Sequence, residues 1–251
     1  MLQLSAGWHQ TAGKRDYQED GVSRMAWSNG FSLALLSDGM GGAAHGDVAS
    51  REILRAFSET FCEEESESIV SRFQNSLIAT NNHLSDYVRL NPDCDGMGGT
   101  LIAVAFSGES VDWLSVGDSP LWLVRENEIL RLNEDHSRKA ELMQLVEAGQ
   151  MTAEEVAVHP QRNQLTSAVM GYAIDHVDIS STPVQNGDVL LLASDGVESI
   201  PEQELASICD RFSDEGPQAL AEHIVSHVES LDRPHQDNAT VIVLKISGEQ
   251  E

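Results

Sequence analysis

The chain has 251 residues, 41% of them hydrophobic, which is enough to bury a sizeable core in one large domain or two small ones. Acidic residues outnumber basic ones 41 to 15, and the resulting formal net charge of -26 disfavours nucleic acid and anionic membranes as partners. Three widely spaced cysteines argue against a disulfide framework or a cysteine zinc site. Residues 1–15 contain no apolar h-region, so no signal peptide is expected, and the apolar runs are too short to span a bilayer.

The apolar spacing predicts strands and helices that alternate along the chain. Strands are expected over residues 31–36, 100–106, 111–116, 120–124, 128–132, 188–193 and 239–246. Helices are expected over residues 47–62, 69–88, 137–160 and 217–231, where apolar residues recur every three or four positions. Within the third helical segment Gly149 is a stop signal, and Thr152 with Glu155 forms a capping box. The polar tail, 247–251, is expected to fray.

The order of these elements favours an α+β fold. Four strands between residues 100 and 132 follow one another through short connections, which is typical of antiparallel meanders rather than parallel β-α-β units. Two helices precede this meander and another comes late. We therefore expect a four-layer sandwich, two packed antiparallel β-sheets flanked by α-helices. No linker divides the chain, so residues 1–251 are expected to form a single domain.

Five short acidic motifs recur where loops are expected to meet strands. They are RDYQED at 15–20, SDGMGG at 37–42, GDS at 117–119, SDG at 194–196 and DN at 237–238. Together they supply carboxylates for a polynuclear site that would hold a hard divalent cation such as Mg²⁺ or Mn²⁺, since such ions prefer oxygen ligands. A glycine beside the Asp lets the backbone turn so that a carbonyl can also reach the ion.

Each motif taken alone has a plainer interpretation. Arg15 could form a surface ion pair with a neighbouring carboxylate, and Asp38 could cap the helix that follows it. Asp118 and Asp237 could belong to simple turns. The argument is stronger for Asp195, because a carboxylate directly after so apolar a strand would be an uncompensated charge unless something bound it.

Other catalytic patterns are weak or absent. The sequence has no GxSxG elbow and no GxxxxGK[ST] phosphate loop. His223 and His227 lie four residues apart on a predicted helix and could bind Zn²⁺, but no Glu is placed as in a zinc protease, so a solvated helix face is favoured. Asp135-His136-Ser137 is interpreted as a helix start, since catalytic triads are assembled through space. A metal-activated water is then the best available nucleophile.

The ordered motifs resemble those of the metal-dependent serine/threonine protein phosphatases of type 2C, specifically the compact bacterial members. Residues 15–20 resemble the family's Arg-x-x-Asn-Glu-Asp, with Gln18 in place of Asn, and 38–42 resemble Asp-Gly-Met-Gly-Gly. Residues 96–100 resemble Gly-Met-Gly-Thr-Thr. The segments 117–119, 135–137, 159–163, 194–196 and 237–238 also follow the family's order, so the resemblance covers nearly the whole chain.

The resemblance implies two Mg²⁺ or Mn²⁺ ions at one end of a β-sandwich, with a weaker third position. By motif position, Asp38 would bridge the two ions, and Asp195 and Asp237 would hold one of them. The Gly39 carbonyl would hold the other ion, together with one of the acidic residues Glu19 and Asp20. Asp118, with Asp195, would match the third position.

The resemblance also implies a reaction. Arg15 would bind the phosphate of the substrate while a water that bridges the metals attacks phosphorus in line, without a phosphoenzyme. Residues 140–170 would form a flap that selects substrates. Met40 stands where many eukaryotic members carry a His proposed as general acid. Gly99 and Pro120 replace a Thr and an Arg, but none of these changes removes a predicted metal ligand, so an active enzyme is expected.

The sequence therefore predicts a cytoplasmic, monomeric phosphatase that acts on phosphorylated proteins, opposing a Ser/Thr kinase, with no nucleic acid or membrane partner. A non-catalytic binding module of the same fold is the alternative, and it should have lost one of Asp38, Asp195 and Asp237. An acidic Ca²⁺-binding protein is disfavoured, because the EF-hand loop pattern is missing.

Overall fold

The computed structural model describes residues 2–41, 45–66 and 68–248. Its strands are β1 (Leu2–Thr11), β2 (Asp20–Ala26), β3 (Ser32–Met40), β4 (Gly98–Gly99), β5 (Leu101–Phe106), β6 (Ser110–Val116), β7 (Leu121–Arg125), β8 (Glu128–Arg131), β9 (Asp178–Pro183), β10 (Val189–Ala193) and β11 (Ala239–Gly248). Its helices are α1 (Gly46–Glu63), α2 (Ile69–Leu90), α3 (Arg138–Glu147), α4 (Ala153–Ala157), α5 (Glu202–Arg211) and α6 (Pro217–Ser230), with 3-10 turns η1 (Pro92–Cys94) and η2 (Asp195–Ser199). None of the helices described here combines the length and the apolar character needed to cross a membrane.

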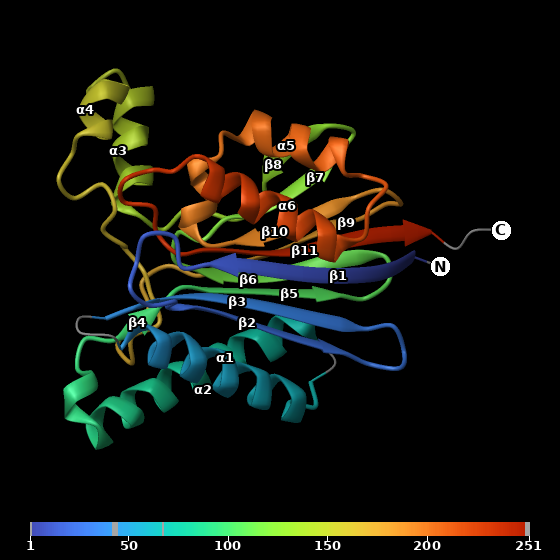
Figure 1. The fold of residues 1–251 in the computed structure, drawn as a ribbon. Coiled ribbons are helices and arrows are strands. Elements are labelled where there is room, and N and C mark those ends of the chain that lie inside the picture. Colours follow the sequence, from blue (N-terminus) through green and yellow to red (C-terminus); the bar gives the residue numbers. More distant parts are fainter. Residues whose placement is uncertain (1, 42–44, 67, 249–251) are drawn as a thin grey trace.

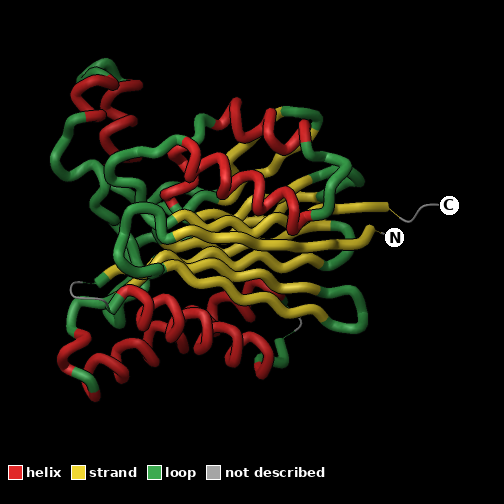
Figure 2. Tube along the Cα trace, in the orientation of Figure 1, coloured by secondary structure: helices red, strands yellow, loops and turns green. Residues whose placement is uncertain are grey.

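The strands form two antiparallel sheets that pack face to face (Figure 2). The first sheet has the order β1-β11-β10-β7-β8 and the second β2-β3-β5-β6-β9, with β4 paired to the end of β3. Helices α5 and α6 cover the first sheet, and α1 and α2 cover the second (Figure 1). The expected α+β sandwich of four layers is confirmed.

Strand β3 illustrates why the apolar runs carry no polar alternation. Leu33 and Leu35 face a cluster shared with α1 and α2, whereas Ala34 and Leu36 face the layer between the two sheets. Both faces of the strand are covered, so both sets of side chains gain from burial. A third apolar cluster lies between the first sheet and helices α5 and α6.

The structure differs from the sequence-based elements mainly at the sheet edges. Strands β1, β2 and β9 and helix α5 were not predicted, and each carries polar or half-buried positions that weaken its apolar pattern. The helical segment predicted over 137–160 divides into α3 and α4, and the predicted capping box of Thr152 and Glu155 is present. These two helices, named here the α3–α4 arm (residues 138–157), project from the sandwich (Figure 1).

Helix α6 approaches edge strand β1 closely at Gly7. A Cβ added there would lie 2.3 Å from the backbone nitrogen of Gln218. The Gln218 side chain also bonds the strand: its Oε1 accepts from Trp8 N at 3.2 Å and its Nε2 donates to Trp8 O at 3.1 Å. The helix can therefore cover β1 at this distance only if residue 7 has no side chain.

Gly7→Ala is expected to destabilise the protein by about 2–4 kcal/mol, because backbone atoms cannot move aside as a flexible side chain would. Thermal unfolding would measure this as a fall in Tm of roughly 5–10 °C. Gly248→Ala is the matched control, since its Cβ would meet no atom of the described residues nearer than 3.7 Å. Equal Tm values for the two variants would contradict the close approach.

Candidate metal centre

The acidic motifs converge on one cavity of about 310 Å³ at one end of the sandwich. Seven of the eight predicted site residues line it: Arg15, Glu19, Asp38, Gly39, Asp118, Asp195 and Asp237. The lining also includes residues that the sequence did not assign a role: Met40, Gly41, Thr100, Asn163, Leu165 and Asn238. Both sheets contribute, because Asp38 lies on β3 of the second sheet while Asp195 and Asp237 flank β10 and β11 of the first.

Asp20, the eighth predicted residue, is buried beside this cavity with 7% of its surface exposed. Its Oδ2 accepts hydrogen bonds from Ser194 Oγ at 2.8 Å and Thr240 Oγ1 at 2.7 Å, which attach β2 to the first sheet. Its Oδ1 has no hydrogen-bond partner among the residues that the structure describes. In the β2–β3 register, Asp20 stands directly opposite Asp38. An unpartnered buried carboxylate oxygen beside a second carboxylate calls for a cation.

Thr100 positions Asp38 through the backbone. The Asp38 N–H donates to Thr100 Oγ1 at 2.9 Å, and the Thr100 N–H donates to Asp38 O at 2.9 Å. Thr100 Oγ1 also lies 2.7 Å from Ser119 Oγ, next to Asp118. One threonine thus connects the strand that carries Asp38 with the loop that carries Asp118. Asp38 does not cap α1, because that helix has His45 at its N-cap position.

Asn238 holds the Arg15 loop against the start of β11. Its Nδ2 donates to Ala12 O at 3.0 Å and to Tyr17 O at 2.9 Å, while its Oδ1 accepts from Glu19 N at 2.8 Å. A side chain that both donates and accepts is required, which selects an amide over a carboxylate. The Asp-Asn motif at 237–238 was identified from the sequence, but a role was predicted only for Asp237.

Two glycines let the loops of the site touch. A Cβ at Gly39 would lie 2.0 Å from Gly46 O, and one at Gly196 would lie 1.9 Å from Asn238 O. In both cases the clash is with backbone, so any side chain would push the loops apart. This close approach keeps Gly39 in the lining of the cavity.

The crowded carboxylates hold their protons unusually tightly. Burial raises the pKa of Asp195 to about 7 and those of Asp20 and Asp118 to about 6, and neighbouring carboxylates add to the effect. Burial, then the charges of Asp20 and Asp195, raise the pKa of Asp38 well above its ordinary value. Negative charge at the site is therefore poorly compensated by the protein itself.

Arg15 is the one Lys or Arg among the described residues that line the cavity. Its Nη2 donates to Asp237 Oδ2 at 2.7 Å, and the guanidinium remains about half exposed to the cavity and solvent. The ion pair considered from sequence exists, but its partner is Asp237 rather than a carboxylate of the same motif. The hydrogen bond and charge of Asp237 raise the pKa of Arg15 above its ordinary value.

The donor set fits hard divalent cations. Within residues 2–41, 45–66 and 68–248, no three Asp, Glu, His or Cys side chains form a closed cage for one ion. Ions bound here would accordingly use a backbone carbonyl and waters beside the carboxylates, as Mg²⁺ and Mn²⁺ commonly do. The unpartnered Asp20 Oδ1 and the raised carboxylate pKa values agree with that ligation.

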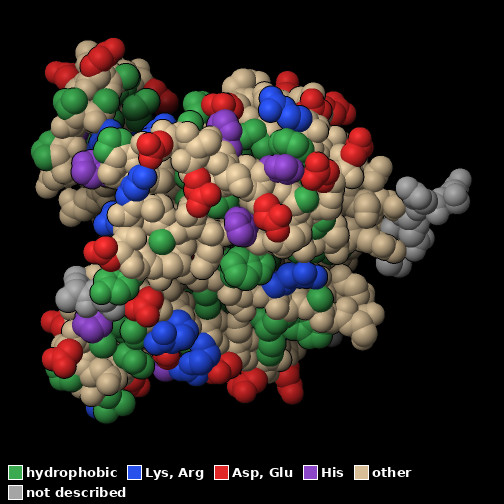
Figure 3. Space-filling model, viewed as in Figure 1, with side chains coloured by type: hydrophobic (Ala, Val, Ile, Leu, Met, Phe, Trp, Pro, Cys, Tyr) green, Lys and Arg blue, Asp and Glu red, His purple; other side chains and the backbone are tan. Residues whose placement is uncertain are grey.

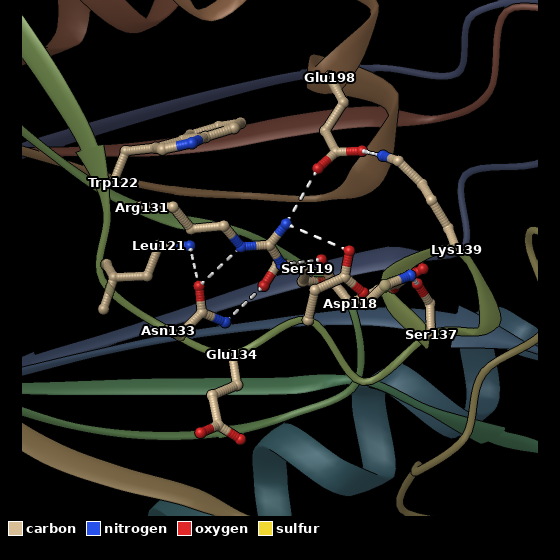
Figure 4. A network of polar contacts seen from close by, with 12 residues as sticks. Asp118, Ser119, Leu121, Trp122, Arg131, Asn133, Glu134, Ser137, Lys139 and Glu198 are labelled. Atoms are coloured by element: carbon tan, nitrogen blue, oxygen red, sulfur yellow. Dashed lines mark hydrogen bonds and ion pairs between the residues drawn. The ribbon is translucent and has the colours of Figure 1, made fainter. Parts of the chain in front are cut away.

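The Asp118 loop is held from behind by a polar network (Figure 4). Arg131 Nη2 donates to Asp118 O at 2.7 Å, and Arg131 Nη1 donates to Glu198 Oε1 at 3.1 Å. The second oxygen of Glu198 accepts from Lys139 Nζ at 2.8 Å. Asn133 completes the network, since its Nδ2 donates to Ser119 O at 3.0 Å. Arg131 thus joins the Asp118 loop to η2 and, through Glu198, to the α3–α4 arm.

The remaining candidates from the sequence have structural roles. His223 pairs with Glu215 at 3.1 Å and His227 pairs with Glu204 at 3.1 Å, so each imidazole faces a carboxylate of its own. Ser137 is the N-cap of α3, which confirms that the Asp-His-Ser motif starts a helix. His136 is buried and its Nδ1 accepts from Gly117 N at 3.2 Å.

Comparison with known proteins shows the family to which the chain belongs. The protein phosphatase 2C family profile matches residues 12–236. The chain belongs to the protein phosphatase 2C family. The resemblance drawn from the motifs is therefore confirmed. The matched residues include every motif but the last, all of the second sheet and strands β7, β8 and β10 of the first sheet.

Bacterial members are similar to this 2C-family chain in sequence. It is 32% identical over 168 residues to the serine/threonine protein phosphatase PstP of Mycobacterium tuberculosis; the match covers 67% of the chain but 32% of PstP, so the chain spans about a third of that relative's length. It is 32% identical over 199 residues to the serine/threonine phosphatase stp of Listeria welshimeri, with 77% of the chain and 78% of the relative covered.

Solved structures of bacterial phosphatases are similar to this chain in fold. The crystal structure of the M. tuberculosis phosphatase PstP/Ppp matches with a TM-score of 0.83 at 27% identity, covering 99% of this chain and all of that one. The catalytic domain of PstP in complex with two manganese ions matches with a TM-score of 0.81 at 26% identity, covering 99% of this chain and 100% of that one.

Metal-free protein should lose stability as the pH rises. The raised pKa of Asp195 means that the folded state binds the proton more tightly, so its contribution is fully present below the ordinary value of 3.8 and is lost as the pH passes about 7. Asp195→Asn should therefore raise the Tm of the metal-free protein at pH 7.5 by roughly 2–6 °C. Asp214→Asn, at an exposed position, is the control and should leave Tm unchanged.

Asn238→Asp should loosen the Arg15 loop. The carboxylate can still accept from Glu19 N but can no longer donate to Ala12 O and Tyr17 O, and it adds a charge beside Asp237. We expect a loss of about 2–4 kcal/mol in the free energy of unfolding. Faster hydrogen exchange over residues 12–19 would locate the change, and unchanged exchange there would contradict the role of Asn238.

Proposed function

We propose that this chain is a metal-dependent phosphatase that hydrolyses phosphoserine and phosphothreonine in proteins. The observation that carries the proposal is a single cavity in which Arg15 faces Asp38, Asp118, Asp195 and Asp237. The carboxylates suit divalent cations, and a guanidinium suits a phosphate. The name and the bound manganese of PstP support the same activity in a relative. A 2C-family binding module without activity would gain nothing from so costly a cluster of charge.

Two Mg²⁺ or Mn²⁺ ions are proposed. Asp38 would bridge them, Asp195 and Asp237 would hold one, and the Gly39 carbonyl would hold the other with help from Glu19 or Asp20. Asp118 and Asp195 would provide a weaker third position. When bound, such ions supply an acidified water and neutralise phosphate oxygens.

The residues of this chain would act mainly by binding and orientation. Arg15 can exchange its bond to Asp237 for two parallel bonds to phosphate oxygens once cations occupy the carboxylates. Among the described residues that line the cavity there is no Ser, Cys or His, and the Thr100 hydroxyl is already bonded to Asp38 N and Ser119. A water rather than a side chain is accordingly the proposed nucleophile, and no phosphoenzyme forms.

The biological setting is also a proposal. Phosphorylated proteins are the expected substrates, with a Ser/Thr kinase or its targets as partners, and a monomer acting in the cytoplasm is expected. All three cysteines are free thiols, which agrees with a reducing compartment. The surplus of negative charge should repel phosphoproteins from most of the surface, so productive encounters depend on the metal-loaded end.

Hydrolysis of a small aryl phosphate with Mn²⁺, with Mg²⁺ and with excess chelator tests the activity. Turnover should require the metal, and Asp38→Asn should lower kcat/KM roughly a thousandfold while leaving the fold intact by circular dichroism. No turnover with either ion, from folded protein, would favour the binding module.

Arg15→Ala should mainly raise KM for a phosphopeptide, roughly tenfold, because it removes a phosphate ligand and not a metal ligand. Arg15→Lys is the matched variant. It keeps the charge but loses the bidentate geometry, so it should recover only part of the affinity. An unchanged KM in Arg15→Ala would remove Arg15 from substrate binding.

A further inference from the structure

A second hollow of about 300 Å³ adjoins the metal cavity. The two share Asn163, Asp195 and Asp237, but Arg15 lines only the first. The second hollow extends instead toward the α3–α4 arm and the loop before β11, where Lys139, Arg162 and Arg233 line it. A substrate residue next to the phosphorylated one would enter this hollow when the phosphate occupies the first.

The three cations come from separate segments of a strongly acidic chain. Lys139 belongs to the first turn of α3, Arg162 to the segment after α4, and Arg233 to the segment between α6 and β11. Figure 3 shows Lys and Arg side chains in the region where the arm meets the sandwich. Three of only 15 basic residues in the chain therefore surround one hollow beside the site.

Two of these cations keep free hydrogen-bonding capacity. Arg162 Nη1 donates to Ala157 O at 2.6 Å, and Arg233 Nη2 donates to Ser199 O. Within the described part of the chain, neither guanidinium is paired with a carboxylate, whereas Lys139 is paired with Glu198. A guanidinium has five N–H donors, so both arginines can still bind an anion from outside.

The balance of charge around the hollow depends on the metal site. The hollow is lined by three carboxylates, Glu198, Asp195 and Asp237, so its negative charges equal the three positive charges of Lys139, Arg162 and Arg233 in number. If divalent cations bind Asp195 and Asp237, as proposed above, Glu198 alone remains to oppose three positive side chains. The hollow then carries excess positive charge next to the bound phosphate.

We propose that this hollow, with Arg162 and Arg233, is a subsite for a second anionic side chain of the substrate, a phosphate or a carboxylate within three residues of the one that is dephosphorylated. The proposal rests on the phosphatase function proposed above and names its substrate class: acidic or multiply phosphorylated segments. Elsewhere the acidic surface would repel such segments, so the subsite would select where they bind.

The test uses a set of phosphothreonine peptides that carry serine, glutamate or phosphoserine at each position from three before to three after the target. For the Mn²⁺-loaded protein, kcat/KM at the best position should be roughly five- to tenfold higher with an anion than with serine. The glutamate and phosphoserine arms distinguish the two sources of charge. The preference should shrink in 0.5 M salt, because screening weakens exposed ion pairs.

Substitutions of the two arginines test whether the preference for a second anion arises in the hollow. Arg233→Gln and Arg162→Gln should each reduce the preference to about twofold or less, and Arg233→Lys should keep more of it than Arg233→Gln. Arg211→Gln is the matched control: it removes an exposed arginine at the end of α5 that does not line the hollow, and it should leave the preference intact. Tm values measured for all variants separate loss of binding from loss of folding.

Two outcomes would overturn the subsite: a preference below twofold at every position, or an equal preference in wild type and in both glutamine variants. Failure of the phosphatase proposal looks different, since no peptide would then be hydrolysed. In that case fluorescence anisotropy of phosphonate analogues, one with and one without the second anion, decides the matter. Tighter binding of the dianionic analogue that Arg233→Gln abolishes would support the subsite, and equal binding would reject it.

Discussion

Asp20 and Asp38 stand opposite each other on neighbouring strands, so their carboxylates repel each other. The rest of the site depends on the fold being stable in spite of this repulsion. Like charges directly across a sheet destabilise it. Here the cost is limited by the hydroxyl groups of Ser194 and Thr240, which donate to Asp20. The raised pKa values of Asp20 and Asp38 show that their negative charge is still not fully compensated. The fold must therefore be stable enough elsewhere to hold these groups together, and its three apolar clusters provide that stability.

Both sheets contribute residues to the cavity. Asp38 lies on the second sheet, whereas Asp195 and Asp237 come from the first, so the apolar layer between the sheets sets how far apart the carboxylates stand. Asn238 and Thr100 then fix the loops locally. Position at the site is thus determined by packing at long range and by single polar side chains at short range.

The sequence predicted the parts of this molecule whose signals are local. Asp195 could be identified because a charge directly follows a fully apolar strand, and the four-layer sandwich followed from the order of strong elements. Edge strand β1 could not be predicted, because its partner β11 lies more than 200 residues further along the chain and its own burial pattern is irregular. The same limit explains why Arg15 was assigned neighbouring partners and meets Asp237 instead.

Roles carried by through-space contacts were also missed. Nothing in the residues around Thr100 indicates that it connects strand β3 with the Asp118 loop, and nothing around Asn238 indicates that it holds the Arg15 loop. These partners are known only once the strands of the sheets are paired. The assignment of individual ligands came from family resemblance rather than from spacing. Residue patterns alone indicated carboxylates for a metal, but not which of them would share an ion.

Because the carboxylate cavity lies at one end of the sandwich, the loops at the other end can vary in sequence and length with less effect on the site. The turns that join β2 to β3, β5 to β6, β7 to β8 and β9 to β10 contribute no residue to the metal cavity. Insertions there would alter surface and mass without touching the carboxylates. That end is accordingly where a reporter domain could be spliced into the chain, and where related proteins are free to diverge in length.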